Sequence, residues 1–457
     1  MPVIIGMERE TVNVWERRAP FSPAHVKILV GKGCKVLVQP SDRRVYTDGE
    51  YTAAGAVLAE DLSACTHIFG VKQPLLEDVL PEKTYCFFSH TIKAQKDNMA
   101  LLDDLLKKRV QLLDYEMFEN ENGQRLVMFG QYAGRVGMVD ILGGLGLRLL
   151  AFGFNTPFSY IAPMRTYRSK AEAYSTLDRI GKDISDGKMP NSLGPLIFAF
   201  TGTGNVSQGA QEVARRLPHE YVSVEQLPEI AKNAPTTKVY LCVVDPEHHM
   251  VDKDTGAKCE GFRQFIANPA QYKSLFNQLI APYASVIVNG IVWQPHHPRL
   301  LTNEDAVALF NPPPKDKAAA KGQGQLPHSL VAICDISADP GGSVEFIDRC
   351  TTIDRPFFLL DVHCNGQRHT TDEFDTPKGV LICSVDNMPA EMPMEATDHF
   401  GELLTPFVDD IVKCQATGDE SLLQQLNPVV KKAMITSHGK LTDKYKYIEE
   451  LRRKLHG

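Results

Sequence analysis

Short apolar runs alternate with amphipathic stretches along the first part of the chain. This alternation is typical of β-α units, in which the strands of a parallel sheet are joined by helices that cover its faces. The amphipathic stretches at 23–32 and 97–108 predict two of these helices. The apolar runs predict strands at 3–6, 35–38, 67–71, 84–88 and 111–113.

A glycine-rich segment at 130–152 is apolar on nearly every side. It predicts a long buried helix that joins two lobes, with glycines that allow close packing. The apolar runs then resume and predict a second sheet, at 195–201, 239–244, 285–289, 330–336, 357–362 and 380–385. The predicted fold class is therefore α/β, with two doubly wound lobes and a cleft between them.

The same pattern divides the chain into three parts. We expect a first lobe at 1–130, a dinucleotide-binding lobe at 131–385, and a C-terminal segment at 386–457 whose helices pack back on the lobes. The segment 311–328 combines Pro, Ala, Lys and Gly without periodicity, which predicts a mobile surface loop. The amphipathic stretch at 441–455 predicts one of the C-terminal helices.

The first strand of the second series breaks into a glycine loop, and a helix-like stretch follows at 210–217. Gly202 lets the chain turn tightly, Gly204 lets the backbone approach a pyrophosphate, and the helix N–H groups face its charge. The pattern departs from G-x-G-x-x-G, because Ser207 stands at the sixth position and the third glycine is Gly209. A plain strand-to-helix turn is the alternative, but the setting favours a dinucleotide site. The candidate cofactor-binding residues are Gly202, Gly204, Asn205, Val206, Ser207, Asn289 and Asp335.

Composition narrows the classes of partner. Of 457 residues, 43% are hydrophobic and 23% are charged, and a net charge of −7 offers no broad attraction to nucleic acid or to an anionic membrane. The apolar runs are too short to span a bilayer. Ten cysteines are spread singly, which favours free thiols in a reducing compartment. The adjacent histidines at 248–249 and 296–297 lack a ligand pattern, so we expect no metal site.

Ionisable residues stand at the ends of successive predicted strands in the first lobe. Lys72, His90 and Glu116 each follow a strand, and Glu16 and Arg18 come after the first strand. Because ligands of open α/β sheets bind beyond the carboxyl ends of the strands, these side chains indicate one pocket; unrelated surface charges are the alternative. A lysine and a histidine in one cleft lower each other's pKa, which suits proton transfer. Arginines suit carboxylates and glutamate suits an ammonium, so the pattern predicts an oxidoreductase that acts on a carboxylate bearing an oxo or amino group.

Five longer motifs, at 15–20, 85–95, 200–207, 332–339 and 443–448, carry a resemblance to a known family. In them, and nearly end to end, the chain resembles the lysine–ketoglutarate reductase part of the bifunctional aminoadipic semialdehyde synthases. Its two lobes are also similar to those of alanine dehydrogenases and of fungal lysine-forming saccharopine dehydrogenases. The resemblance implies an enzyme of lysine degradation that joins the ε-amine of L-lysine to 2-oxoglutarate and reduces the imine to saccharopine, usually with NADPH.

The resemblance also implies roles for single residues. They are acid/base catalysis for Lys72 and His90, carboxylate binding for Arg18 and Arg125, contact with the amine for Glu16 and Glu116, and contact with the nicotinamide for Asp339. Which of the first pair is the acid and which the base is left open. Three alternatives are an NADH-dependent, lysine-forming saccharopine dehydrogenase, an alanine dehydrogenase-like enzyme that uses pyruvate and ammonia, and a non-enzymatic NADPH-binding regulator.

The bifunctional relatives carry a saccharopine-oxidising half, whereas this sequence ends at Gly457. We therefore expect a protein that forms saccharopine without oxidising it, either as a homo-oligomer or beside a separate oxidising domain. The resemblance implies a mitochondrial matrix location. The start of the sequence, which shows no presequence, favours the cytoplasm instead.

One departure bears on the choice of cofactor. The family has a basic residue just before the paired histidines, where this chain has the run Asp245, Pro246 and Glu247. If that loop faces the adenosine ribose, an acid would favour NADH, although Glu220 and Glu225 also lie near the expected distance from Gly202. NADPH remains the prediction from the resemblance.

Overall fold

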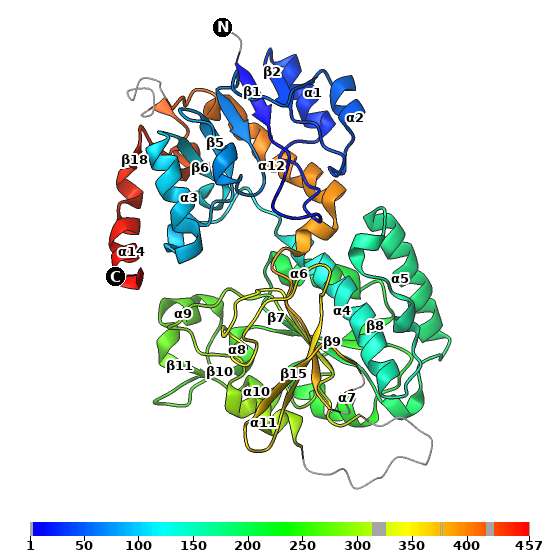
Figure 1. Cartoon of the computed structure of the whole chain (residues 1–457). Coiled ribbons are helices and arrows are strands. Elements are labelled where there is room, and N and C mark those ends of the chain that lie inside the picture. The colour runs from blue at the N-terminus through cyan, green and yellow to red at the C-terminus, as the bar shows by residue number, and fades with distance from the viewer. Residues whose placement is uncertain (1–2, 313–325, 375, 377, 417–424, 457) are drawn as a thin grey trace. The chain divides into compact units, whose positions relative to one another are not determined.

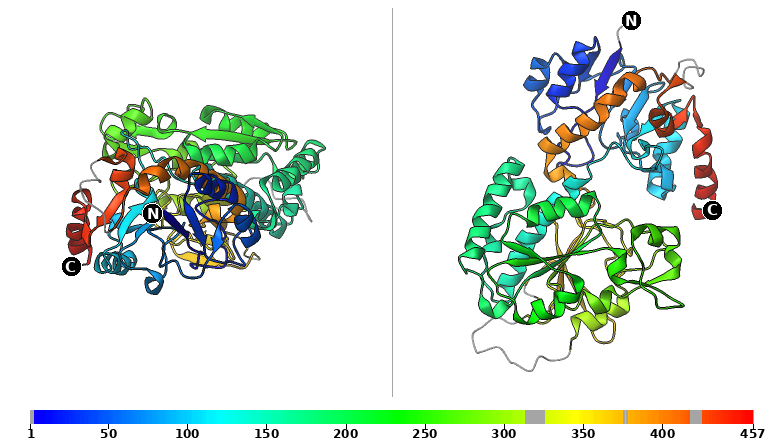
Figure 2. Two further views of the ribbon diagram at one scale, coloured as in Figure 1. Left: turned by 90° about the horizontal axis from the view of Figure 1, so that it is seen from above. Right: turned by 180° about the vertical axis from the view of Figure 1, so that it is seen from behind.

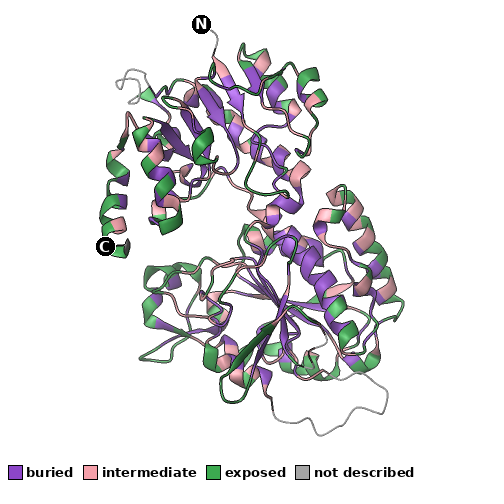
Figure 3. Cartoon of the chain, in the orientation of Figure 1, coloured by how far each residue is buried: buried purple, intermediate pink, exposed green. Residues whose placement is uncertain are grey.

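A computed structural model describes residues 3–312, 326–374, 376, 378–416 and 425–456 (Figure 1). The chain divides into two compact units. Unit 1 comprises Met1–Phe129 and Pro393–Gly457, and unit 2 comprises Gly130–Met392. Within each unit, buried residues gather on the strands and exposed residues on the outer faces of the helices (Figure 3).

Unit 1 is built on an eight-stranded sheet. Its strands are β1 (Ile4–Met7), β2 (Lys35–Val38), β3 (Val57–Leu58), β4 (His67–Phe69), β5 (Thr84–Phe87), β6 (Gln111–Asp114), β17 (Met434–Ser437) and β18 (Lys440–Leu441). They are ordered β18-β17-β6-β5-β4-β1-β2-β3, and β1 to β6 are parallel. Chain order therefore reverses between β1 and β4, which is where ligands of such sheets bind.

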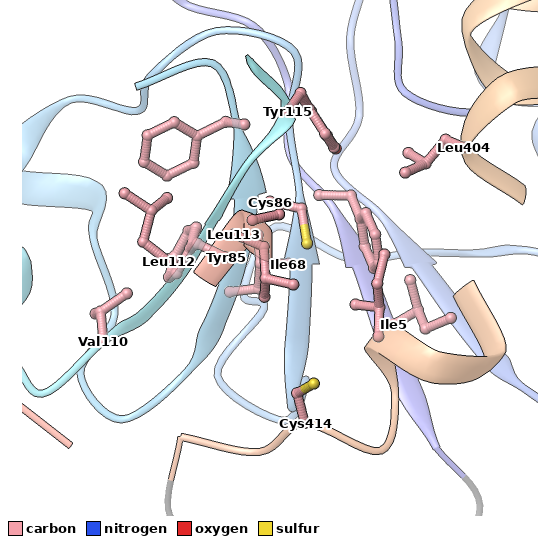
Figure 4. Close-up of a cluster of buried hydrophobic side chains, with 14 of the residues drawn as sticks. Ile5, Ile68, Tyr85, Cys86, Val110, Leu112, Leu113, Tyr115, Leu404 and Cys414 are labelled. Carbon is pink, nitrogen blue, oxygen red and sulfur yellow. The ribbon is translucent and has the colours of Figure 1, made fainter. Parts of the chain in front are cut away.

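The last part of the chain completes the core of unit 1. The helices of this unit are α1 (Pro23–Gly31), α2 (Asp48–Ala53), α3 (Lys96–Lys107), α12 (Pro393–Ile411), α13 (Pro428–Ala433) and α14 (Tyr447–His456). Leu404 of α12 joins Ile5 and Ile68 of the sheet in one buried cluster (Figure 4). At the far end of the chain, α14 runs beside α3 (Figure 2), where Arg452 pairs with Asp103 at 2.6 Å.

Unit 2 has a second eight-stranded sheet. Its strands are β7 (Ile197–Thr201), β8 (His219–Tyr221), β9 (Val239–Val244), β12 (Val286–Asn289), β13 (Ala332–Asp335), β14 (Phe358–Val362), β15 (Arg368–Thr371) and β16 (Val380–Cys383). They are ordered β15-β14-β16-β13-β12-β7-β9-β8. Chain order reverses between β7 and β12, so the glycine loop after β7 lies at the reversal point. A separate two-stranded sheet pairs β10 (Met250–Asp252) with β11 (Tyr272–Ser274).

Glycines bring two helices of unit 2 into backbone contact. The helices of this unit are α4 (Gln131–Ala151), α5 (Lys170–Ser185), α6 (Asn205–Ala214), α7 (Leu227–Asn233), α8 (Pro246–His249), α9 (Phe262–Ala267), α10 (Phe276–Leu279) and α11 (Asn303–Phe310). A Cβ on Gly134 of α4 would lie 1.9 Å from the carbonyl oxygen of Val206, and one on Gly209 of α6 would lie 2.1 Å from that of Gln131. No side chain fits at either position, so these glycines set how closely α6 lies against α4.

The predicted fold class is confirmed, and most predicted strands agree with the structure to within one or two residues. The glycine-rich segment at 130–152 forms α4, as predicted. The cleft between the lobes and the three-part domain division stay predictions. The predicted loop at 311–328 falls mostly on 313–325, which lie outside the described residues.

Several elements differ from the sequence prediction, among them a helix that starts earlier than expected and two strands of the large sheets. The helix expected at 210–217 begins at Asn205, because the glycine loop already ends at Gly204. The strand β14, predicted as one more parallel strand, is antiparallel to β16 and forms a hairpin with β15. The strand β17, where no strand was predicted, adds antiparallel to β6.

Candidate active site

The carboxyl ends of β1 and β4 meet at the reversal point of the unit 1 sheet. The two carboxylate oxygens of Glu10 accept hydrogen bonds from the backbone N–H groups of Val71, at 2.5 Å, and of Lys72, at 3.0 Å. Burial and then the nearby charge of Glu16 raise the pKa of Glu10 to about 8. The half-buried Lys72 thus stands on a segment fixed by an acid that the sequence interpretation overlooked.

Glu16 and Arg18 form a buried ion pair. The Nε and Nη2 atoms of Arg18 donate to Oε1 and Oε2 of Glu16 at 2.7 and 2.6 Å. The guanidinium also lies 4.2 Å from the ring centroid of Phe129. The two side chains predicted to bind a carboxylate and an amine therefore hold each other. A substrate carboxylate that reached Arg18 would share the guanidinium with Glu16.

His90, Glu116 and Arg125 form a second cluster. The Nδ1 atom of His90 lies 3.5 Å from Oε2 of Glu116, and Nη2 of Arg125 donates to Oε1 at 3.0 Å. Burial pushes the pKa of Glu116 upward, but the hydrogen bond from His90 and the charge of Arg125 outweigh it, so the net pKa is lowered. The structure thus brings three predicted site residues together around one ionised carboxylate.

The backbone at His90 is held in an uncommon conformation. Its φ of 54° lies in the left-handed region, which few residues other than glycine adopt. Such strain gathers at functional sites, where the surrounding structure enforces it. Here Asn98 Nδ2 donates to the carbonyl oxygen of His90 at 3.1 Å, and the His90 ring stacks on Phe88 with the two planes 16° apart.

Two buried residues that the sequence interpretation missed support this loop. Asp114, at the end of β6, accepts hydrogen bonds from the backbone N–H and the hydroxyl of Ser89. It also accepts one from the backbone N–H of Glu116 at 2.8 Å. Burial raises the pKa of Asp114 to about 6. The signal in the sequence was a pair of acids two positions apart at the end of a strand. Asp114 holds the loop, and Glu116 faces His90.

Aromatic rings lie between the two clusters. Phe88, which stacks with His90, has its ring centroid 6.0 Å from that of Phe129, the ring under Arg18. The clusters therefore belong to one region of unit 1. The interaction between Lys72 and His90 that was expected to tune both groups stays a prediction.

The glycine loop of unit 2 has the geometry of a phosphate cradle. Gly202 has a φ of +72° and donates its N–H to the carbonyl oxygen of Val244 at 2.8 Å. Gly204 precedes α6, and a Cβ placed on it would meet no described atom within 4 Å. Among the described residues no side chain caps α6, so its first turn at 205–207 can turn backbone N–H groups toward a pyrophosphate. Ser207 itself is buried and accepts a bond from Gln211 at 3.0 Å.

Asn289 and Asp335 brace the edge beside this loop. Asn289 is fully buried; it accepts from Thr201 Oγ1 and donates to Asp335 Oδ1, both at 2.8 Å. Burial raises the pKa of Asp335 to about 7. This network joins the carboxyl ends of β7, β12 and β13. The half-buried Asp339 follows in a turn, where its carbonyl oxygen accepts the N–H of Gly342 at 2.9 Å.

Neither a metal cluster nor a membrane span appears in the part of the chain that the structure describes. There, His, Cys, Asp and Glu side chains form no group of three or more that could hold a metal ion. In the same residues, every helix is too short or too polar to cross a bilayer.

Two family models match the chain. The alanine dehydrogenase/PNT N-terminal domain matches residues 6–136, and the alanine dehydrogenase/PNT C-terminal domain matches residues 328–444, together more than half of the sequence. The chain belongs to the alanine dehydrogenase/PNT family. In agreement with this, a solved L-alanine dehydrogenase superimposes with a TM-score of 0.60 at 17% identity and covers 99% of this chain, which shows the shared fold.

Curated relatives of this family member fall into two groups. The mitochondrial alpha-aminoadipic semialdehyde synthase of Bos taurus is 48% identical over 98% of this chain, and that of Arabidopsis thaliana is 40% identical over 98%. The chain spans about half the length of these relatives, at 48% and 42%. The saccharopine dehydrogenase [NAD(+), L-lysine-forming] of Yarrowia lipolytica is 24% identical, with 89% of this chain and 91% of that protein covered. The resemblance predicted from the sequence is confirmed.

Proposed function

We propose that this chain condenses L-lysine with 2-oxoglutarate and reduces the resulting imine to saccharopine. The observation that carries the proposal is the 48% identity to alpha-aminoadipic semialdehyde synthase across 98% of the chain. The fold alone would not suffice, because one fold hosts many activities. The ion-paired groups at the carboxyl edge of the unit 1 sheet supply the proton-transfer and carboxylate-binding chemistry that this reaction needs.

The His90 cluster is assigned to the condensation. The ε-ammonium of lysine, with a pKa of about 10.4, must lose a proton before its nitrogen can attack the 2-oxo carbon. His90 or Lys72 accepts that proton, and the other group protonates the carbinolamine oxygen so that water leaves. Glu116 orients the His90 ring through Nδ1. Arg125, and the Glu16–Arg18 pair, bind the carboxylates of 2-oxoglutarate.

Unit 2 is assigned to the nicotinamide cofactor, which when bound supplies a hydride to the imine carbon. Gly202, Gly204 and the first turn of α6 would hold the pyrophosphate through backbone N–H groups. The buried Asn289–Asp335 pair would keep the neighbouring strand ends in place. Asp339 is assigned to the nicotinamide side by family resemblance. The resemblance also implies NADPH, whereas Asp245, the residue that follows β9, favours NADH.

A single spectrophotometric assay tests the reaction. The purified chain is mixed with lysine, 2-oxoglutarate and either NADH or NADPH, and the loss of reduced-nicotinamide absorbance is followed. We expect oxidation that needs both substrates, and a product with the mass of saccharopine. Pyruvate plus ammonia serves as the control pair. Turnover with that pair, and none with lysine plus 2-oxoglutarate, would replace the proposal with an alanine dehydrogenase-like reaction.

The reverse direction is a second candidate. The Yarrowia lipolytica relative is named for lysine formation with NAD(+), and it matches along nearly its whole length. Incubation of the chain with saccharopine and NAD(+) or NADP(+) measures that direction, and the ratio of the two rates near neutral pH decides between them.

For the cellular location, we propose the mitochondrion on the names of the Bos taurus and Rattus norvegicus relatives, with the cytoplasm as the alternative. Fractionation of the source cells decides this.

Association is proposed as well. A homo-oligomer, or a complex with a separate saccharopine-oxidising protein, would let saccharopine be consumed where it forms. Light scattering of the purified chain, alone and mixed with such a protein, measures both.

A further inference from the structure

The order of strands in unit 2 identifies the residue beside the glycine loop. β9 pairs directly with β7, with Val244 opposite Thr201, whereas β8 lies outside β9 at the sheet edge. In dinucleotide-binding sheets, the glycine loop follows one strand. The residue that contacts the adenosine ribose follows the neighbouring strand of the sheet. Here the residue that follows the adjacent strand is Asp245. Sequence distance alone points instead to Glu220 or Glu225, but β8, which carries Glu220, does not touch β7.

The contacts of Asp245 place its carboxylate next to the loop. The hydroxyl of Thr203, in the glycine loop, donates a long hydrogen bond to Oδ1 of Asp245 at 3.4 Å. One residue earlier, the carbonyl oxygen of Val244 accepts the N–H of Gly202 at 2.8 Å. Asp245 as a whole is half-buried.

The charges around Asp245 suit a hydroxyl better than a phosphate. Burial and then the neighbouring charge of Glu247 raise the pKa of Asp245, and the charge of His248 and the hydrogen bond from Thr203 offset this rise only in part. Nδ1 of His248 accepts the backbone N–H of Asp245 at 2.9 Å. The pKa of Glu225 is lowered first by the hydrogen bond with Ser223 and then by a backbone hydrogen bond, with smaller contributions from the charges of Lys258 and His248.

We propose that Asp245 makes this chain select NADH over NADPH, by accepting hydrogen bonds from the ribose hydroxyls of the adenosine half. The inference rests on the proposed dinucleotide site and adds its specificity. The 2′-phosphate of NADPH would bring a second anion against the carboxylates of Asp245 and Glu247, whereas the free 2′-hydroxyl of NADH donates to Asp245. Asp245 is also the residue before α8, and a purely structural capping role is the competing explanation.

Fluorescence titration of the full chain with NADH and with NADPH, without other substrates, tests the inference. We expect the unaltered chain to bind NADH at least about tenfold more tightly, on the scale of one charge-assisted hydrogen bond. In Asp245→Asn, whose amide still caps a helix, that ratio should fall about tenfold or more. Glu220→Gln is the matched control: it removes one negative charge from the edge strand and should leave the ratio unchanged.

Several outcomes would overturn the inference. They are tighter binding of NADPH by the unaltered chain, an unchanged ratio in Asp245→Asn, and a shifted ratio in Glu220→Gln. Competition of ADP-ribose and 2′-phospho-ADP-ribose against bound NADH in the unaltered chain measures the same preference if Asp245→Asn does not fold. Selective NADH binding with no turnover of lysine and 2-oxoglutarate would remove the proposed function and keep the inference. No binding of either dinucleotide would remove both.

Discussion

The two large sheets reverse their strand order in the same way, yet their carboxyl edges are chemically different. At the unit 1 edge, carboxylates face cations: Glu16 pairs with Arg18, and Glu116 lies between His90 and Arg125. At the unit 2 edge, Asp335 faces the amide of Asn289, and glycine backbone replaces side chains. Under the proposed function, the first edge moves protons and binds charged groups, whereas the second is a fixed frame for a ligand held by N–H groups.

This difference between the two edges shifts the pKa values of their acids in opposite directions. Glu116 has a lowered pKa, because cations outweigh burial. Asp335 has a pKa raised to about 7, because burial outweighs its hydrogen bond from Asn289. One fold thus holds one acid ionised and another close to half-protonated at neutral pH. The partner side chain, and not the topology, decides which state an edge residue adopts.

Loss of the imidazole at the first edge should have the largest effect. We expect His90→Ala to lower kcat about 10²- to 10⁴-fold, as is usual when a general acid or base is removed. His90→Asn keeps a residue that tolerates the left-handed backbone and should lose a similar factor. The spectrophotometric assay measures kcat for both variants. The exposed His369 provides the control in His369→Ala, which should turn over normally. Unchanged kcat in the His90 variants would remove this residue from the chemistry.

In unit 2, added side-chain volume should lower the free energy of unfolding more than a change of charge does. A Cβ on Gly134 would lie 1.9 Å from the backbone of α6, so Gly134→Ala must push α6 and its glycine loop aside. We expect a loss of about 3 kcal/mol in the free energy of unfolding, at the upper end for an overpacked site. NADH affinity should fall with it. Urea unfolding and fluorescence titration measure these effects.

The matched control for the packing prediction is Gly31→Ala in α1. A Cβ on Gly31 would meet no described atom within 4 Å, so this variant should unfold at the same urea concentration as the unaltered chain or at a slightly higher one, because alanine favours a helix over glycine. Equal stability of Gly134→Ala and Gly31→Ala would show that α4 and α6 can separate without cost. The unit 2 edge would then not be a fixed frame, and the contrast with the unit 1 edge would fail.

Much of this fold could be predicted from the sequence, because buried strands of parallel sheets read as unbroken apolar runs. The run at 239–244, for example, forms β9 with the same bounds. The place of β9 in the sheet could not be predicted, since pairing between strands depends on contacts far apart in the chain. For the same reason β17 was missed: its partner β6 is more than 300 residues away.

The candidate site shows the same division between local and distant information. Lys72, His90 and Glu116 could be selected because each follows an apolar run. The pairing of Glu16 with Arg18 was not anticipated, although two positions of separation in a non-helical segment allow it. Asp114 was missed because its role, to hold Ser89 from the neighbouring strand, depends on the parallel pairing of β5 with β6.

A buried pair of acids in unit 2 should make stability depend on pH. Burial raises the pKa of Asp140 to about 6 and that of Glu391 to about 9, and Arg165 Nη1 lies 3.5 Å from Glu391. Acids with a raised pKa in the folded state stabilise it fully below the unfolded pKa of about 4, and the stabilisation is lost as the pH rises toward 9. Between pH 5 and 9 we expect the free energy of unfolding to fall by several kcal/mol, at about 1.4 kcal/mol for each pH unit that a raised pKa spans.

Asp140→Asn tests this pH dependence. The substitution removes one of the two acids while an amide can still hydrogen-bond to Glu391, so the free energy of unfolding should change less between pH 5 and 9. Asp186→Asn, at an exposed ion pair with Lys182, is the control and should keep the slope of the unaltered chain. Urea unfolding at several pH values gives both slopes. A slope in Asp140→Asn equal to that of the unaltered chain would assign the pH dependence to other groups.

The smallest effect is expected from Arg125, whose side chain is 47% exposed. Arg125→Ala should raise the KM for 2-oxoglutarate about tenfold, the cost of one charge-assisted contact in a partly solvated position, and change kcat less. Because the Arg125 charge helps to lower the pKa of Glu116, its loss should also shift the acid limb of the kcat/KM profile to higher pH. Arg109→Ala, at the exposed pair with Glu82, is the control. An unchanged KM with a shifted acid limb would make Arg125 a positioning residue for Glu116, and the first edge would then bind carboxylates elsewhere.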